Sequence, residues 1–204
     1  MRIIAGRYRS RKLKTMTGTQ LRPTSDRVRE TLFNILAPVI ERSVFLDCYA
    51  GSGAVGLEAL SRGAGEVIWI ESNESAARLI EANAVFLEPK DRRLLVRKPV
   101  HAGLRQLEQR FEQRGVRVDI CFLDPPYEQT PDPVRVLLWL VKSNLMQPTG
   151  LLILEHSKRF QPPERLEADR GISSDGASVG DTDGWTRSRL LVQGDSSLSF
   201  YRRH

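Results

Sequence analysis

The chain has little cysteine and histidine and lacks any long hydrophobic run. Its 204 residues include two cysteines and three histidines, so neither a disulfide framework nor a bound metal is expected. Cys48 and Cys121 each lie in an apolar, strand-like run, which is typical of buried free thiols in a reducing compartment. No apolar run approaches the roughly 18 residues that span a membrane. The basic N-terminus is followed by no apolar signal core. We therefore expect a cytoplasmic protein with no membrane partner.

What the chain does have is an uneven positive charge. Its net charge is +6, and residues 1–30 hold nine Lys/Arg and two acidic residues, a balance of +7. The other 174 residues balance at −1. A concentrated basic segment is typical of a protein that binds a polyanion, although a solvated surface face is the simpler alternative. The cations of this segment are Arg2, Arg7, Arg9, Arg11, Lys12, Lys14, Arg22, Arg27 and Arg29.

The first forty residues predict a small basic extension. Residues 2–15 suggest a β-hairpin, and a helix is expected to start at residues 23–26, where several residues are suitable N-caps. This helix is expected to bury one face. That face carries Val28, Leu32, Ile35 and Val39, with Arg27 and Arg29 pointing away from it.

From residue 44 onward, strand-like and helix-like segments alternate. The expected strands are 44–47, 67–71, 93–96, 118–124 and 150–155, and the expected helices are 54–62, 74–87, 101–114 and 133–144. This alternation predicts an α/β domain over residues 41–204, with a mostly parallel sheet and helices on both faces. Residues 165–189 are rich in Gly, Ser and Asp and predict a flexible loop. The segments 190–193 and 198–201 predict a terminal antiparallel hairpin.

A glycine loop follows the first of these strands. Gly51-Ser52-Gly53-Ala54-Val55-Gly56 fits the G-x-G-x-x-G pattern, and Glu71 follows 20 residues later, at the end of the second strand. That spacing alone suggests a dinucleotide site. However, Asp47 stands four residues before Gly51, where a carboxylate would repel a pyrophosphate. S-adenosylmethionine carries a cationic amino group and is therefore the better match.

A rigid turn follows the fourth strand of this domain. Asp124-Pro125-Pro126-Tyr127 comes directly after four apolar residues. Proline fixes φ and has no N–H, so the carboxylate of Asp124 and the carbonyl of Pro125 stay outside any backbone ladder. Two acceptors at a fixed spacing, with an aromatic ring beside them, suit a flat heterocycle that carries an exocyclic amino group. In a doubly wound sheet this turn and the glycine loop open on the same crevice.

Taken together, these motifs resemble the Rossmann-type methyltransferases that modify amino nitrogens of bases. The turn itself is shared by enzymes of adenine N6, cytosine N4 and guanine N2. Three longer stretches, residues 1–6, 21–34 and 46–64, closely resemble the RsmD-type family, and the ending 194–201 is similar as well. These bacterial enzymes methylate one guanine N2 of 16S ribosomal RNA. The resemblance implies a seven-stranded S-adenosylmethionine-dependent methyltransferase fold that ends in an antiparallel hairpin.

The resemblance also implies roles for residues of both motifs. Asp124, Pro125, Pro126 and Tyr127 are the expected catalytic residues. The expected cofactor-binding residues are Asp47, Tyr49, Ala50, Gly51, Ser52, Gly53, Glu71 and Ser72. The nine cations of residues 1–30 are expected to bind RNA, and the expected partner is 16S ribosomal RNA or a small-subunit assembly intermediate, bound by a monomer. The alternatives are a DNA or RNA amino-methyltransferase acting on adenine N6 or cytosine N4, and a non-catalytic RNA-binding assembly factor.

Overall fold

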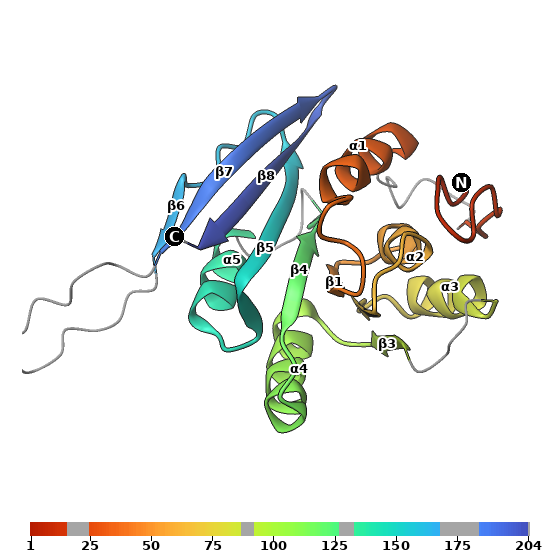
Figure 1. The fold of residues 1–204 in the computed structure, drawn as a ribbon, viewed down its shortest axis with the longest axis horizontal. Coiled ribbons are helices and arrows are strands. Elements are labelled where there is room, and N and C mark those ends of the chain that lie inside the picture. The colour runs from red at the N-terminus through yellow and green to blue at the C-terminus, as the bar shows by residue number, and fades with distance from the viewer. Residues whose placement is uncertain (16–24, 87–91, 127–132, 168–183, 204) are drawn as a thin grey trace, which may run out of the picture.

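The computed structural model describes residues 1–15, 25–86, 92–126, 133–167 and 184–203 (Figure 1). After an N-terminal segment, residues 1–15, helices and strands follow in the order α1 (Asp26–Leu36), β1 (Val44–Cys48), α2 (Ala54–Ser61), β2 (Glu66–Ile70), α3 (Glu74–Ala84), β3 (Arg93–Val96), α4 (Val100–Arg114), β4 (Val118–Leu123), α5 (Pro133–Lys142), β5 (Met146–Ser157), β6 (Arg165–Glu167), β7 (Gly184–Gln193) and β8 (Ser196–Arg203). None of the helices within these ranges is long and apolar enough to cross a membrane.

The strands form one sheet in the order β3-β2-β1-β4-β5-β8-β7-β6. β3, β2, β1, β4 and β5 pair in parallel, whereas β8, β7 and β6 add antiparallel strands at the other side. The predicted α/β class and the terminal hairpin are confirmed. The sheet has eight strands where seven were expected, because the three-residue β6 lies in a stretch that the sequence predicted to be a loop.

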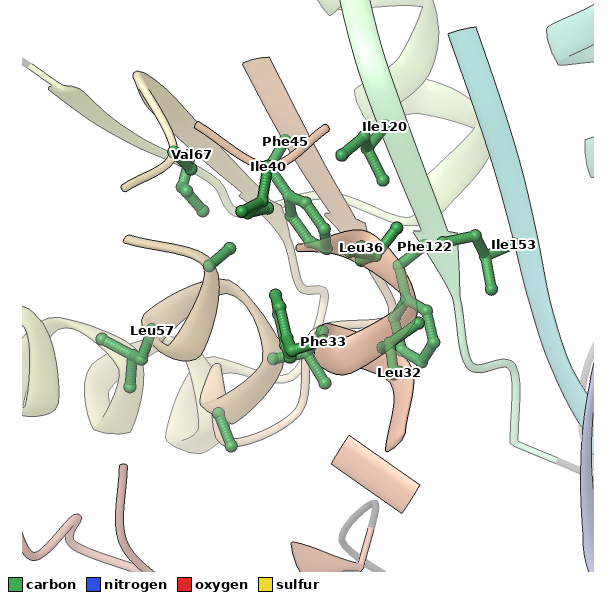
Figure 2. Close-up of a cluster of buried hydrophobic side chains, with 14 of the residues drawn as sticks. Leu32, Phe33, Leu36, Ile40, Phe45, Leu57, Val67, Ile120, Phe122 and Ile153 are labelled. Carbon is green, nitrogen blue, oxygen red and sulfur yellow. The ribbon is translucent and has the colours of Figure 1, made fainter. Parts of the chain in front are cut away.

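Alternating side chains on the central strands build two cores, one on each face of the sheet. Phe45 on β1 and Val67 on β2 face α1 and α2, and Phe33 of α1 stacks on Phe45 with ring centroids 6.0 Å apart (Figure 2). Their neighbours Leu46 and Ile68 pack on the opposite face, with the buried residues of α4 and α5. The central strands are therefore covered on both faces, as in other parallel sheets.

The buried stripe of α1 is wider than the sequence predicted. Ser25 caps the helix by accepting from the N–H of Val28, and the buried positions are Val28, Arg29, Leu32, Phe33 and Leu36. Val39 is 41% exposed because the helix ends at Leu36, just before Pro38. The prediction that Arg29 points away from the core is wrong, since its position lies in line with Phe33 and Leu36 at helical spacing.

The C-terminal part differs from the prediction at two places. The expected loop over 165–189 is wrong at both ends, because Arg165–Glu167 and Gly184–Arg189 belong to strands, and residues 168–183 lie outside the described residues. Trp185 is the physical reason for the second difference, since its indole is buried against the α4 and α5 core and fixes this end of β7. β5 begins at Met146, earlier than expected, and an irregularity in its pairing with β4 absorbs the extra residues.

Candidate active site

Three carboxylates lie on one face of the sheet, at the carboxyl ends of its central strands. Asp47 is in phase with Phe45 on β1, and the register sets Asp47 opposite Trp69 on β2 and Phe122 on β4. Glu71 lies two residues after Trp69, and Asp124 lies two residues after Phe122. Side chains alternate with a period of two, so all three carboxylates project toward the α1–α2 face. Asp124 and Glu71 are close enough to Asp47 for their negative charges to raise its pKa.

Asp47 is the deepest of these carboxylates. It is only 2% exposed, and its Oδ2 accepts a hydrogen bond of 2.9 Å from the N–H of Gly56 in α2. Burial raises the pKa of Asp47 well above its ordinary value; the Gly56 hydrogen bond opposes this shift, and the charges of Asp124 and Glu71 add to it. A cation placed near this carboxylate would offset the unfavourable charge. The site therefore favours a positively charged ligand group.

The glycine loop leaves β1 through a series of left-handed residues. Tyr49, Gly51 and Gly53 have φ of 60°, 53° and 75°. The left-handed turn at Tyr49 breaks the alternation, so its side chain packs on the α4–α5 side of the sheet. Burial there raises the pKa of Tyr49 to about 12. A non-glycine residue in this conformation is uncommon and stores strain, which is frequent at functional sites.

Glu71 fastens the glycine loop to the end of β2. Its Oε2 accepts from the N–H of Gly51 at 2.7 Å, and its Oε1 accepts from the N–H of Asn73 at 2.7 Å. A carboxylate offers about four acceptor positions, so two remain for a ligand hydroxyl. The space beside Gly51 is open, because a side chain there would meet only the Tyr49 carbonyl oxygen, at 4.0 Å. The remaining predicted cofactor residues, Ala50, Ser52 and Ser72, lie in the same two loops.

The Asp-Pro-Pro turn stands next to this loop. β1 and β4 are neighbours in the sheet, and the N–H of Asp124 approaches the carbonyl oxygen of Cys48 at 3.5 Å. Asp124 is half-buried, Pro125 is buried and Pro126 is exposed. The turn thus continues the pairing of the two strands by one residue before the chain departs. Tyr127 lies outside the described residues.

The predicted basic residues divide into exposed and buried ones. Seven of the nine are exposed, namely Arg2, Arg7, Arg9, Arg11, Lys12, Lys14 and Arg27, and Arg22 lies outside the described residues. The prediction that Arg29 binds RNA is wrong, because its side chain is fully buried in contact with other parts of the protein. Its Nη2 donates to the carbonyl oxygen of Arg2 at 2.6 Å and to Asp26 at 2.9 Å.

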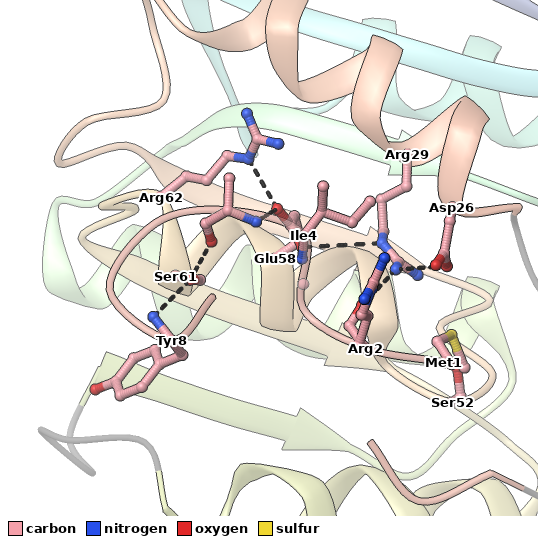
Figure 3. Close-up of polar contacts among 12 residues, drawn as sticks. Met1, Arg2, Ile4, Tyr8, Asp26, Arg29, Ser52, Glu58, Ser61 and Arg62 are labelled. Carbon is pink, nitrogen blue, oxygen red and sulfur yellow. Dashed lines mark hydrogen bonds and ion pairs between the residues drawn. The ribbon is translucent and has the colours of Figure 1, made fainter. Parts of the chain in front are cut away.

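A buried carboxylate that the sequence did not single out anchors the N-terminal segment. Glu58 of α2 is completely buried and accepts from the backbone N–H groups of Ile4 and Ala5 at 2.7 and 2.9 Å (Figure 3). Arg62 donates to the same carboxylate at 2.8 Å, and the Nε of Arg29 lies 3.9 Å from it. Only the preference of a buried acid for a nearby cation, Arg62 four residues later, hints at this contact in the sequence.

Two further side chains of the helices hold the same segment. Ser61 Oγ accepts from the N–H of Tyr8 at 3.0 Å and donates to the carbonyl oxygen of Ala5 at 2.5 Å. Asn83 of α3 pairs with both backbone groups of Lys14, at 2.7 and 3.0 Å. The segment also folds back on itself, with Arg2 and Lys12 bridged in antiparallel fashion. In place of the β-hairpin predicted over residues 2–15, the segment has turns and this isolated bridge, and its basic side chains stand on a backbone held by α2 and α3.

Comparisons with known proteins identify relatives of this chain. Residues 1–175 match the family model described as conserved hypothetical protein 95. The chain is 39% identical over 158 residues to the ribosomal RNA small subunit methyltransferase D of Haemophilus influenzae, which covers 78% of this chain and 79% of that one. It is 33% identical over 167 residues to YlbH of Bacillus subtilis, provisionally named an rRNA methyltransferase, covering 81% and 88%. A solved structure of yhhF from Escherichia coli, provisionally titled a methyltransferase, superimposes with a TM-score of 0.73 at 30% identity and covers 100% of this chain and 98% of that one.

Replacing Asp47 should stabilise the ligand-free protein. The folded-state pKa of Asp47 is raised above its unfolded value of about 3.9, so the folded protein holds this proton more tightly than the unfolded chain does. Stability is therefore lost as pH rises above about 4. The Asp47→Asn variant keeps an acceptor for Gly56 without this loss. We expect it to be more stable than the wild type at neutral pH and equally stable near pH 3, measured by urea unfolding at each pH. A difference independent of pH would contradict this account.

Removing the charge of Glu58 should release the N-terminal segment. The Glu58→Gln variant loses one of the two backbone contacts and removes the buried partner of Arg62 and Arg29, which leaves Arg29 only the exposed Asp26 as a counter-charge. Breaking comparable buried pairs costs about 3 kcal/mol. Urea unfolding measures the loss, and faster amide hydrogen exchange at Ile4 and Ala5 locates it. The control is Glu66→Gln, which removes the exposed Arg114 ion pair and should cost less than about 1 kcal/mol. Equal effects of both variants would show that Glu58 is no special anchor.

Proposed function

Because this chain belongs to the conserved hypothetical protein 95 family, we propose that it transfers a methyl group from S-adenosylmethionine to the exocyclic N2 of a guanine in 16S ribosomal RNA. The observation that carries the proposal is the adjacency of two turns on the paired strands β1 and β4. The glycine loop provides room for a methyl donor, and the Asp124 turn provides acceptors for an amino group. The named relative from Haemophilus influenzae supports ribosomal RNA as the substrate.

The residues around the glycine loop fit S-adenosylmethionine better than a dinucleotide. Asp47, Glu71 and Asp124 make this edge of the sheet negative, which favours a cationic ligand and disfavours a pyrophosphate. The free acceptor positions of Glu71 suit ribose hydroxyls. The open side of Gly51 lets a ligand approach the backbone closely. When bound, S-adenosylmethionine supplies an electrophilic methyl group on a positively charged sulfur.

Asp124 and Pro125 act on the nucleophile. The lone pair of guanine N2 is delocalised into the ring, so the nitrogen is a poor nucleophile. Hydrogen bonds from its NH₂ to the Asp124 carboxylate and the Pro125 carbonyl favour a pyramidal nitrogen whose lone pair is available. The same acceptors stabilise the positive charge that develops on the nitrogen. Pro126 keeps the turn rigid, and Tyr127 is proposed, from the sequence, to stack on the base.

The basic extension, residues 1–40, attracts and positions the RNA. Its exposed cations contact phosphates, which makes binding sensitive to salt. The target guanine is unpaired or turned out of its helix, because a stacked base cannot enter a site between two strand ends. We place the reaction in the cytoplasm, where a monomer acts on small-subunit RNA during assembly.

The proposal is tested by incubating the protein with labelled S-adenosylmethionine and undermethylated small subunits, or their naked RNA, and by mapping the modified nucleotide. Label on the N2 of one guanine is the expected result. Transfer to adenine N6 or cytosine N4, or to duplex DNA in place of RNA, would reject the proposed substrate. Saturable cofactor binding with no transfer to any substrate would identify a non-catalytic RNA-binding protein.

The role of Asp124 predicts a selective loss of turnover. The Asp124→Ala variant should lower kcat at least a hundredfold, because a group that stabilises developing charge is removed from the reacting nitrogen. Its affinity for S-adenosylmethionine, measured by calorimetry, should stay close to that of the wild type, since the glycine loop is held by Glu71. The control is Asp119→Ala, which removes a carboxylate from the opposite end of β4, where it accepts from Val44. A parallel loss of affinity and turnover in Asp124→Ala would refute the assigned role.

Neutralising part of the basic segment should change the salt dependence of RNA binding. In the triple variant Arg2→Gln, Arg9→Gln and Lys12→Gln, three exposed cations are removed from the N-terminal segment. Each phosphate contact on a single strand contributes about 0.7 to the slope of log K against log salt concentration. The loss of three contacts should therefore make this slope shallower by roughly two. The matched control is the triple Gln variant of Lys98, Arg105 and Arg110. These exposed cations lie just before α4 and along it, and α4 packs on the other face of the sheet. An equal change in the two triple variants would show that the charge acts without regard to its location.

A further inference from the structure

Two aromatic rings and two arginines form a cluster on the outer side of the N-terminal segment. Tyr8 of this segment meets Phe86, two residues after α3, edge to face, with ring centroids 5.9 Å apart and planes at 66°. The guanidinium carbon of Arg11 lies 3.6 Å from the centroid of Phe86, and that of Arg7 lies 5.4 Å from the centroid of Tyr8. The cluster therefore joins the first residues of the chain to the end of the third helix.

This cluster is accessible. Arg7 and Arg11 are exposed, Tyr8 and Phe86 are half-buried, and the neighbouring Val85 is 65% exposed. Within the part of the chain that the structure describes, neither arginine forms an ion pair with a carboxylate. Their positive charge is therefore available to a ligand.

The backbone beneath the cluster is fixed before any ligand arrives. The N–H groups of Arg7 and Tyr8 donate to the carbonyl oxygen and the hydroxyl of Ser61, at 2.7 and 3.0 Å. Asn83 holds Lys14 on the other side. A side chain at Gly6 would place its Cβ 1.9 Å from the Ser61 carbonyl oxygen, so the chain passes the end of α2 in close contact. Such preorganisation lowers the entropy lost on binding.

The chemistry of the cluster matches a nucleobase. A guanidinium is flat and weakly hydrated, and it already lies against the ring of Phe86, so its outer face accepts a second flat group. Bases stack on aromatic rings and on arginine planes, and the exposed cations Arg9 and Lys12 on the same segment supply phosphate contacts. An acidic peptide would use the charges and leave the flat surfaces unused.

The position of the cluster separates it from the proposed active site. α2 begins beside the glycine loop at Gly53 and ends at Ser61, which holds Tyr8. Its eight residues span about 12 Å at 1.5 Å per residue. We propose that Tyr8, Arg11 and Phe86 form a second base-binding site, which stacks an unpaired base a few nucleotides from the target guanine. This inference rests on the proposed RNA substrate.

Two substitutions remove stacking while they retain charge or apolar volume. Arg11→Lys keeps the positive charge but loses the flat guanidinium, and Phe86→Leu keeps an apolar side chain but loses the ring. Each should weaken the binding of undermethylated small-subunit RNA, measured by fluorescence anisotropy, by roughly fivefold to a hundredfold, with the salt slope unchanged. Arg105→Lys, an exposed arginine of α4, is the matched control, and Phe86→Tyr should bind as the wild type does. Arg11→Lys and Phe86→Leu variants that bind as tightly as Arg105→Lys would overturn the proposal.

Abasic scanning of a bound RNA of about ten nucleotides identifies the stacked base. At one position, loss of the base should weaken binding to the wild type and leave binding to Phe86→Leu unchanged, which is the signature of a direct coupling. Equal losses for both proteins at every position would refute the site. Thermal unfolding and S-adenosylmethionine affinity confirm that each variant is folded. Because the readout is binding, a wild type that binds RNA but transfers no methyl group would reject the proposed reaction and leave this site standing.

Discussion

The parallel pairing of β1 with β4 is the constraint on which the proposed site depends. These strands are distant in the sequence, yet their register places Asp47 beside Phe122 and Cys48 beside Leu123. Both strands then end at the same level, so the glycine loop and the Asp-Pro-Pro turn leave the sheet next to each other. A slip of one residue would move Asp124 to the opposite face. The alternating burial of β1 and β4 in two separate cores makes such a slip costly, and the register of the site is thus set by hydrophobic packing.

Two buried carboxylates, Glu58 and Asp47, differ in how their charge is compensated. Glu58 is surrounded by two backbone N–H groups and two arginines, so its charge is compensated within the fold. Asp47 receives one backbone hydrogen bond and faces two further carboxylates. Its burial, and after it the charges of Asp124 and Glu71, raise its pKa. A buried carboxylate whose charge is balanced by cations and hydrogen bonds stabilises the fold. A buried carboxylate without a nearby cation is a candidate binding group for a positively charged ligand. This contrast separates the anchor from the site without reference to any relative.

The sequence predicted the central sheet well because its strands are short apolar runs between clear helix signals. The placement of Asp47, Glu71 and Asp124 on one face also follows from the period of two along each strand.

Contacts between residues distant in the sequence could not be predicted from such local patterns. Glu58 contacts Ile4 across 54 positions of the sequence. Arg29 was predicted to lie on the surface because a charged side chain is rarely fully buried, although its spacing in the helix matches the buried stripe. Phe86 was missed because its partner, Arg11, lies far earlier in the sequence, in the N-terminal segment. β6 was missed because three residues carry too little pattern.

Because the basic segment is anchored to α2, it can position a bound RNA as well as attract it. A flexible basic tail would raise the local concentration of RNA but would leave the target free to adopt many orientations. Here the segment is bonded along the side of α2, from Ile4 at Glu58 to Tyr8 at Ser61, and the same helix starts at the glycine loop. The cations and the proposed methyl donor are therefore held by one rigid element, so an RNA that follows the segment meets the site at a defined distance. A stacked base at the far end of α2 would fix that register further, because phosphate contacts alone allow an RNA to slide. Under the proposed function, selection of one guanine among many would then follow from geometry in addition to charge.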